Sequence, residues 1–228
     1  MKNSIPTSVI IRTRNEERWI GHSIQSIIDN ISEPEIIVID NNSSDETLSI
    51  VKSFAKNPNL DLTDKMRYTN INIFNIDDYT PGKSLNLGIK KSNNQNCIII
   101  SAHCVISKIN LDKHFGDLKK YVSIFGNQIP IWNGKKITKR YIWSHFINKK
   151  IVNMYSELEN RYFFHNAISI FEKSFLESHP FDEFLQSKED RYWANDMIQN
   201  HNKKILYDPD IEVYHHYTKN GNTWKGLG

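Results

Sequence analysis

The sequence predicts an α/β protein whose central sheet is mostly parallel and is flanked by helices. Three short runs of β-branched apolar residues, at 7–13, 35–40 and 97–104, suit strands that are buried on both faces. The segments that follow the first two runs carry apolar residues at helical spacing. Strands that alternate with helices in this way form parallel sheets through right-handed crossovers.

The amino-terminal part of the chain opens with a β-α-β-α pattern. Apolar residues at helical spacing predict helices over 16–30 and 48–55. Ser43 and Glu46 are three residues apart, and this capping-box pattern predicts the start of the second helix. Residues 57–70 are polar and are expected to form a loop.

The middle of the chain continues the alternation. Pro81 and Gly82 give a turn signal before a short amphipathic segment. The expected elements are a strand at 71–76, a helix at 84–92, the strand at 97–104 and a helix at 111–121. That strand would deliver Ser101, Ala102 and His103 to the carboxyl edge of the sheet, where α/β proteins bind ligands.

The carboxyl-terminal half is less regular, and its expected elements are mostly strands. They are one or two strands over 122–132, a strand at 162–171, a helix at 188–200 and two short strands at 204–207 and 211–214. No linker divides the chain, so we expect a single domain over residues 1–217. The glycine-rich segment 218–228 is expected to form a flexible tail.

Composition and motifs exclude several classes of protein. The chain has 228 residues and a net charge of +3, well short of a dedicated nucleic-acid-binding protein. Its two cysteines, Cys97 and Cys104, form no CxxC motif and indicate neither a disulfide framework nor a zinc site. No apolar run in the sequence is long enough to span a membrane. We therefore expect a cytoplasmic protein.

Six motifs in a fixed order carry a resemblance to a known family. They are SVIIRTRNE at 8–16, EIIVIDNNSSD at 35–45, GKSLNLGI at 82–89, SAH at 101–103, FDE at 181–183 with ED at 189–190, and YDP at 207–209 with VYHH at 213–216. Together they resemble the family 2 glycosyltransferases, which have the GT-A fold. That family usually has Asp-x-Asp where this chain has Ser-Ala-His, and Arg12 and Arg14 replace its usual residues beside Thr13.

The resemblance implies a binding site for a nucleotide-activated sugar at the ends of the strands. The residues that it implies are Thr13, Arg14, Asn15, Glu16, Asp40, Asn42, Lys83, Ser101 and Ala102. Arg14 and Lys83 are the candidates for phosphate contacts, and a helix N-terminus would assist the lysine. An alternative is that Asp40 and Ser43 only cap the second helix and that Lys83 is a solvated surface residue.

His103 is the candidate ligand for a divalent metal ion. GT-A enzymes typically hold Mn²⁺ or Mg²⁺ against the diphosphate through Asp-x-Asp, and the cation neutralises the leaving group. In this chain His103 could bind the cation together with His215 or His216 of the last strand. It could instead donate a hydrogen bond to the diphosphate without a metal, or it could be a structural histidine.

The resemblance also implies a catalytic base. Inverting sugar transfer needs a carboxylate that takes the proton from the attacking acceptor hydroxyl. Asp190 would be this base, and Glu189 would orient it or bind the acceptor. The alternative is that both acids only complement the dipole of the helix that they begin. His165 and Asn166 would line the donor-sugar and acceptor region, or they could be structural.

The segment 135–150 mixes basic residues with aromatic ones. A basic amphipathic stretch can lie on an anionic membrane surface, and it could also contact a phosphate-bearing acceptor. The alternative is an ordinary half-buried helix with a solvated face.

The leading hypothesis is an inverting glycosyltransferase that moves a sugar from a nucleotide-sugar donor to a glycan or lipid-linked acceptor. Its role would be in bacterial surface polysaccharide synthesis, such as capsule or lipopolysaccharide, at the inner face of the cytoplasmic membrane. A second hypothesis is a non-catalytic nucleotide-sugar-binding module or a degenerate enzyme, because Asp-x-Asp is absent. A nucleotidyltransferase or a dinucleotide oxidoreductase is disfavoured, since residues 8–17 contain no glycine.

Overall fold

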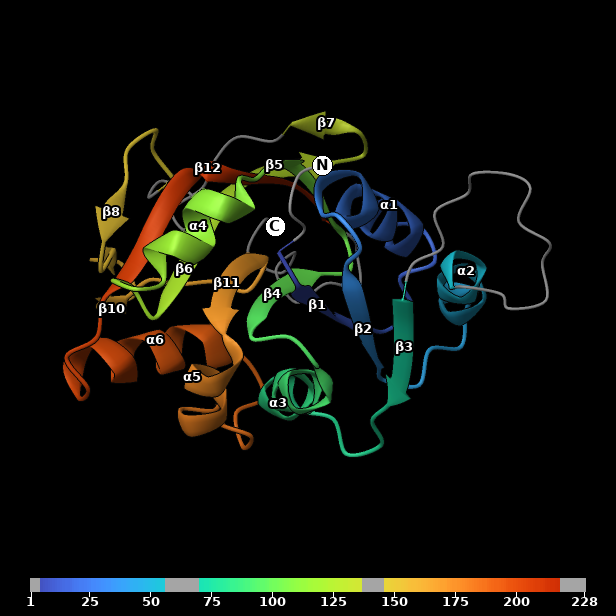
Figure 1. Cartoon of the computed structure of the whole chain (residues 1–228), viewed down its shortest axis with the longest axis horizontal. Helices are drawn as coiled ribbons and strands as arrows, with labels where there is room; N and C mark the ends of the chain where they lie inside the picture. The colour runs from blue at the N-terminus through green and yellow to red at the C-terminus, as the bar shows by residue number, and fades with distance from the viewer. Residues whose placement is uncertain (1–4, 56–69, 137–145, 218–228) are drawn as a thin grey trace.

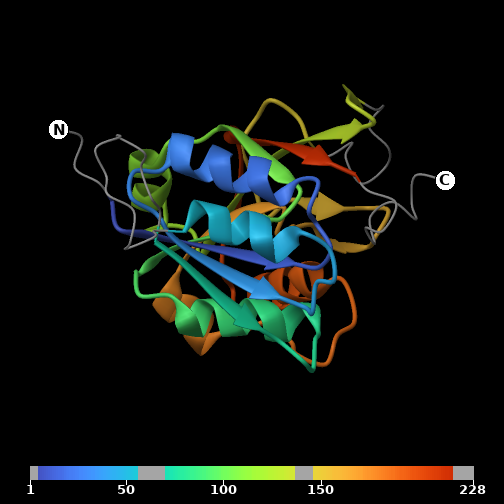
Figure 2. The same ribbon diagram turned by 90° about the vertical axis from the view of Figure 1, so that its right-hand side faces the viewer.

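The computed structural model of the chain describes residues 5–55, 70–136 and 146–217. Its centre is a mixed sheet in the strand order β3-β2-β1-β4-β11-β6-β12-β5, with the short strands β7 and β8 paired at its margins. Helices cover both faces of this sheet (Figures 1 and 2). The predicted α/β class, with one central sheet and flanking helices, is confirmed.

The strands and helices have the following bounds. The strands are β1 Thr7–Thr13, β2 Glu35–Asp40, β3 Asn70–Asn75, β4 Asn96–Ser101, β5 Cys104–Lys108, β6 Ser123–Trp132, β7 Lys135–Lys136, β8 Ile151–Val152, β9 Tyr155–Ser156, β10 Arg161–Tyr162, β11 Ile168–Glu172 and β12 Ile205–His216. The helices are α1 Ile20–Asn30, α2 Thr47–Phe54, α3 Pro81–Lys91, α4 Leu111–Asp117, α5 Lys173–Ser178 and α6 Glu189–Gln199.

The amino-terminal half of the sheet is parallel, and this sets the edge at which a site can form. β1 pairs in parallel with β2 on one side and with β4 on the other, and β2 pairs in parallel with β3. In this register Thr13 lies opposite Asp40, and Arg12 lies opposite Ser101. The carboxyl ends of three strands therefore meet in one row, as expected for an α/β fold.

Two apolar layers hold the helices on the sheet. α3, α5 and α6 pack on one face, through a buried cluster that includes Ile10, Leu85 and Trp193. α1 and α2 pack on the other face, through a cluster that includes Ile24 and Val51. Figure 2 shows α1 and α2 on one side of the strands and α3 on the other. The β-branched runs of β1, β2 and β4 are buried because both faces are covered.

The prediction of a single strand over 97–104 is wrong. The chain turns at Ala102 and His103, so β4 ends at Ser101 and a new strand, β5, begins at Cys104. β5 then pairs in an antiparallel direction with β12, and His215 lies opposite Cys104. The turn thus places His103 beside the end of β12.

Two other elements differ from the expectation, and at a third the structure decides between two open possibilities. The two strands predicted at 204–207 and 211–214 form one strand, β12, whose register against β6 shifts between Tyr207 and Glu212. The segment predicted as a strand at 162–171 is strand only at its two ends. The region 122–132, for which the sequence indicated either one strand or two, forms the single strand β6.

The predicted capping box at the second helix is also wrong. Ser43 donates its hydroxyl to Asp40 over 2.6 Å instead of bonding to the helix, and α2 begins only at Thr47. The reason is that the Ser43 hydroxyl is bound to Asp40, and the backbone N–H of Glu46, which a capping Ser43 would accept, donates to Glu17 over 3.0 Å instead.

Some expectations fall outside the described residues. They concern the tail at 218–228, the loop at 57–69 and residues 137–145 of the basic segment. In the part of the chain that the structure does describe, no helix combines the length and the apolar character that a membrane crossing requires.

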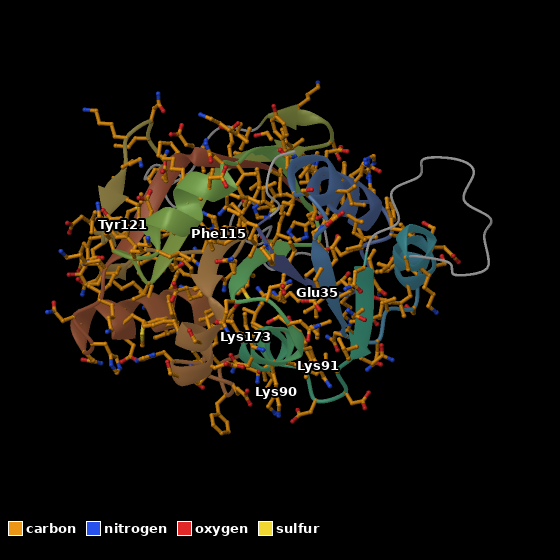
Figure 3. All side chains as sticks on the ribbon, in the orientation of Figure 1. Glu35, Lys90, Lys91, Phe115, Tyr121 and Lys173 are labelled. Carbon is orange, nitrogen blue, oxygen red and sulfur yellow. The ribbon has the colours of Figure 1, made fainter. Side chains whose placement is uncertain are left out.

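The amino-terminal edge of the sheet holds a buried carboxylate, Glu35, which is labelled in Figure 3. Glu35 accepts hydrogen bonds from the Ser8 hydroxyl over 2.5 Å and from the Asn93 backbone over 2.8 Å. It joins the starts of β1 and β2 to the loop after α3. Because its partners are polar groups of the protein, we assign Glu35 a structural role.

Helix α3 approaches β1 so closely that only glycine fits at position 88. A Cβ atom there would lie 2.4 Å from Cγ2 of Ile10. We expect Gly88→Ala to lower the free energy of unfolding by about 1–3 kcal/mol through overpacking, measured by urea denaturation.

Gly116 of α4 is the matched control, because a Cβ atom there would meet nothing within 4 Å. Gly116→Ala should be neutral or raise the free energy of unfolding by up to about 1 kcal/mol. Equal midpoints for the two variants would contradict the close packing of α3 on β1.

Candidate active site

The loops that follow β1 and β2 bind each other at the carboxyl edge of the sheet. The backbone N–H of Asn15 donates to the Ser43 hydroxyl over 2.9 Å, and the side-chain oxygen of Asn15 accepts from the Ser44 N–H over 2.8 Å. Asn15 and Asn42 have positive φ angles of 53° and 52°, which asparagine tolerates better than most residues. The two loops therefore form one rigid rim.

Asp40, at the end of β2, stabilises this rim through hydrogen bonds to Ser43. Its two carboxylate oxygens accept from the backbone and the hydroxyl of Ser43, over 2.9 and 2.6 Å. Asp40 is almost fully buried, and the neighbouring Thr13 hydroxyl is buried without a hydrogen-bond partner among the described residues. Of these two predicted nucleotide-binding residues, Thr13 has a hydroxyl that could bind a ligand, whereas the carboxylate of Asp40 is already bound to Ser43.

His103 and His215 meet where the turn after β4 lies beside the end of β12. Their Nε2 atoms are 2.9 Å apart, and the two rings stack with centroids 4.8 Å apart. Nδ1 of His103 contacts Glu16 over 2.9 Å, and Nδ1 of His215 contacts the side-chain oxygen of Gln128. Each ring thus has an oxygen acceptor at Nδ1 and presents Nε2 to the other ring.

This arrangement restricts what can lie between the two rings. If both Nδ1 atoms donate to their oxygen partners, two Nε2 lone pairs face each other at 2.9 Å, which is unfavourable without a shared proton or cation. Burial, and then the charge of His103, lower the pKa of His215 well below its usual value, so this ring stays neutral. A neutral imidazole whose second nitrogen is held by an acceptor is the form that binds metal ions.

The pair therefore fits a divalent cation in part. Two nitrogens that bind one cation at right angles over ~2.1 Å lie ~3 Å apart, close to the observed separation. Across the described residues, no group of three or more histidine, cysteine or acidic side chains is arranged to hold a metal. The protein offers two nitrogen donors, and any further ligands would have to come from a bound substrate or water.

His216 does not join this pair. Its ring stacks on Trp19 at a centroid distance of 3.8 Å, because neighbouring residues of a strand point to opposite faces. Its backbone N–H donates to the His103 backbone oxygen over 3.0 Å. Burial lowers the pKa of His216 to about 4, so the ring is neutral at physiological pH. His216 thus supports the turn through its backbone.

The two acids at the start of α6 point to different partners. Oε1 of Glu189 lies 2.6 Å from Nη1 of Arg12 on β1. Oδ1 of Asp190 accepts from the backbone N–H of Arg191 over 2.8 Å and from its guanidinium over 3.3 Å. The structure thus links the predicted acid pair to the edge of the sheet through an arginine that the sequence analysis noted only as a departure from the family pattern.

His165 and Asn166 lie under the site. The His165 ring donates to the Gly126 backbone oxygen over 2.9 Å and accepts from the Ala167 N–H over 3.2 Å. Burial lowers its pKa to about 3. Both nitrogens are used by the backbone, which agrees with the structural interpretation of this residue. Asn166 differs, because its side-chain nitrogen is buried without a partner among the described residues, next to Ser101.

For the remaining predicted residues, the described structure shows other partners than the histidine pair. Lys83 lies in the first turn of α3 and forms an ion pair with Asp78. Arg14 is exposed. Phe146 and Lys150 lie at the described end of the basic segment, where Phe146 is buried and Lys150 binds Asp208 over 2.9 Å.

Sequence reasoning did not identify the hydrogen bonds by which Asn86 holds the loop 181–188 before the acid pair; we call these contacts the Asn86 clamp. The Asn86 side chain of α3 donates to the Phe181 backbone oxygen and to Glu183, each over 2.9 Å, and accepts from the Phe181 N–H over 3.0 Å. A Cβ atom at Gly82 would lie 2.1 Å from the Asp182 backbone oxygen. The motif at 82–89 was recognised, but its partner about 95 residues later could not be inferred from spacing.

Comparison with solved structures identifies the class of fold. The chain superposes on residues 1–349 of S. aureus TarS, solved in complex with UDP-GlcNAc, with a TM-score of 0.69 and 19% identity over 96% of this chain and 60% of that one. GalNAc-T7, solved with UDP, GalNAc and Mn²⁺, gives a TM-score of 0.69 and 16% identity over 97% of this chain and 45% of that one. The fold is that of the GT-A glycosyltransferases.

The family follows from the sequence itself. The model of glycosyl transferase family 2 matches residues 8–179, so the chain belongs to this family. The match includes the rim and His103, and it ends before Glu189 and β12. A search of curated proteins gave no match. The chain spans only about 60% of the TarS fragment and 45% of GalNAc-T7, the two structures compared above.

The Asn86 clamp can be tested by stability. We expect Asn86→Ala to lower the free energy of unfolding by about 1–3 kcal/mol, because it leaves buried backbone groups without partners. Hydrogen exchange in residues 181–188 should become faster. The control is Asn70→Ala, at an exposed position of β3, with an expected change within about 0.5 kcal/mol. Unchanged exchange in 181–188 would show that the clamp does not hold the loop.

Proposed function

We propose that this chain is the catalytic domain, over residues 1–217, of an inverting glycosyltransferase that uses a nucleotide-sugar donor. The observation that carries the proposal is the convergence of the rim, the His103–His215 pair and the acids of α6 at one edge of the sheet. The similar structures were solved with UDP-GlcNAc in TarS and with UDP in GalNAc-T7, so UDP-sugars are the donors to test first. The acceptor would be a glycan or lipid-linked hydroxyl in bacterial surface polysaccharide synthesis.

The nucleotide half of the donor would lie on the rim. The Thr13 hydroxyl and the loop of Asn15 and Asn42 would contact the nucleoside, with Asp40 holding the loop in place. Arg14, which is exposed, and Lys83, which would exchange its ion pair with Asp78, would approach the phosphates. Ser101, Ala102 and Asn166 would face the diphosphate and the sugar, and the free side-chain N–H groups of Asn166 supply donors there.

The reaction would be a single displacement. The acceptor oxygen attacks the anomeric carbon, the bond from that carbon to the diphosphate oxygen breaks, and the nucleoside diphosphate leaves. Asp190 takes the proton from the acceptor hydroxyl as the new bond forms. Asp190 is the better candidate of the two acids, because its side chain is 12% exposed, whereas that of Glu189 is 4% exposed and lies 2.6 Å from Arg12.

A bound Mn²⁺ or Mg²⁺ would neutralise the charge of the leaving diphosphate. His103 and His215 would hold it, Glu16 and Gln128 would keep both rings in the orientation that presents Nε2, and His216 would not take part. Without a cation, the Nε2–H of His103 would donate to the diphosphate instead of to His215.

The second candidate, a non-catalytic nucleotide-sugar-binding module, is favoured by one observation. Ser101 replaces a carboxylate at the end of β4, so the usual acidic motif is missing. Turnover of donor by the wild-type protein would exclude this candidate. A peripheral contact with the cytoplasmic membrane through 135–150 remains a prediction from the sequence.

The base assignment can be tested by substitution. Asp190→Asn should reduce donor turnover by about 10²–10⁴-fold and leave nucleotide binding intact, because the amide cannot accept the proton. Release of nucleoside diphosphate from a panel of UDP-sugars, with an acceptor mixture, measures this. Asp196→Asn, on the half-exposed part of the same helix, is the matched control and should keep wild-type activity. Unchanged turnover in Asp190→Asn would assign the base elsewhere.

The histidine pair can be tested by electron paramagnetic resonance of Mn²⁺ added with UDP. We expect hyperfine coupling to two imidazole nitrogens, of which one is lost in His103→Ala and one in His215→Ala. His216→Ala should retain both couplings, because this ring stacks on Trp19. A spectrum without nitrogen coupling in the wild-type protein would exclude the pair as metal ligands.

A further inference from the structure

Arg12 lies in the row of residues at the carboxyl edge of the sheet. It is the second-to-last residue of β1, and its partner on β4 is Ser101. From there its guanidinium reaches the first residue of α6, where Nη1 lies 2.6 Å from Oε1 of Glu189. The Glu189 side chain is 4% exposed and that of Arg12 is 27% exposed. The contact therefore joins the nucleotide edge to the acid pair in a largely buried position.

Each acid of the pair has its own guanidinium. Glu189 faces Arg12 from β1, and Asp190 faces Arg191 from its own helix. Arg191 is shared with Glu159, to which its Nε donates over 3.0 Å. The other titratable groups that act on these residues are the Tyr79 phenol, near Arg12, and the neutral His165 ring, near Asp190. The two arginines thus flank the two adjacent carboxylates, and Glu159 lies on the other side of Arg191.

Two adjacent buried carboxylates do not stay ionised without such partners. Burial raises the pKa of Glu189 above its usual value, and the charge of Asp190 adds to this, while Arg12 opposes both. For Arg12 burial is the largest single influence and lowers the pKa, but the attraction of Glu189, Tyr79 and Asp190 together outweighs it, and the pKa is raised. Removal of the guanidinium would leave two like charges side by side, and one proton would then be shared by the pair.

We propose that Arg12 is a positioning residue that holds Glu189 ionised and turned toward β1, so that Asp190 is the one carboxylate left to accept the proton of the acceptor. The proposal rests on the proposed transferase function for its catalytic half. The other half of the proposal, that the ion pair with Arg12 keeps Glu189 ionised, does not depend on the reaction.

The first arm of the test measures stability against pH for Arg12→Gln and Arg12→Lys, each made in the wild-type and in the Glu189→Gln background. A carboxyl group with a raised folded pKa stabilises the fold at low pH and loses this contribution as the pH rises through that pKa. Removal of Arg12 raises the pKa of Glu189 further. The loss of stability in Arg12→Gln should therefore be larger at pH 8 than at pH 5.

The two backgrounds separate the ion pair from simple packing. In the Glu189→Gln background the effect of Arg12→Gln should not change between pH 5 and pH 8, and Arg12→Lys should behave nearly as wild type in both backgrounds. An Arg12→Gln effect that is equal at both pH values in the wild-type background would overturn the proposal.

The second arm measures donor turnover across the same pH range. In Arg12→Gln the acid limb of the kcat/KM profile should shift to a pH about one unit higher than in the wild-type protein. In Arg12→Lys it should lie at the wild-type pH. Adding Arg12→Gln to Glu189→Gln should cause no further shift. A loss of activity that is uniform across pH and is not rescued by lysine indicates a structural role and overturns the catalytic half. If the wild-type protein turns over no donor, the proposed function fails, and the stability arm still decides the ion pair.

Discussion

The parallel register of β1, β2 and β4 is the constraint on which the rest of the site depends. It fixes Thr13 opposite Asp40 and Arg12 opposite Ser101, so that three strands end in one row. A shift of one residue in any strand would turn these side chains to the other face of the sheet. Both faces are covered by helices, and the apolar runs of the strands therefore hold the register firmly.

Two long-range contacts complete the site on this row. The turn at Ala102 and His103 brings β5 against β12, and this places His103 beside His215. The ion pair between Arg12 and Glu189 then ties α6 to β1. Through these contacts a chain without the usual acidic motif still gathers polar side chains at the carboxyl edge of the sheet. The His103 imidazole lies in the region where the family normally has carboxylates, and Arg12 lies opposite Ser101 on the neighbouring strand.

The sequence was sufficient for the fold class and for the order of the motifs, because buried parallel strands leave a clear signal of short β-branched runs. It also gave, as one of three alternatives for His103, a meeting with His215 or His216 of the last strand. The alternation of side chains along β12 decides this in favour of His215, and it can be applied only once the strand and its partners are known.

Other features could not be predicted from local patterns. The turn that splits 97–104 is favoured by the pairing of β5 with β12, more than 100 residues further along the chain. The Arg12 and Glu189 pair joins positions 177 residues apart, and the Asn86 clamp joins positions 95 residues apart. Propensity and periodicity describe neighbours in sequence, whereas these contacts arise from the packing of α3 and α6 on one face of the sheet.

The measurement that tests the central claim most directly is a calorimetric titration of the protein with UDP, GDP, CDP and TDP, with and without Mn²⁺. Our account predicts that at least one nucleotide binds at a single site, and that Mn²⁺ strengthens this binding if the histidine pair holds the cation. Absence of binding by every nucleotide under both conditions would contradict the assignment of this site to a nucleotide-sugar donor.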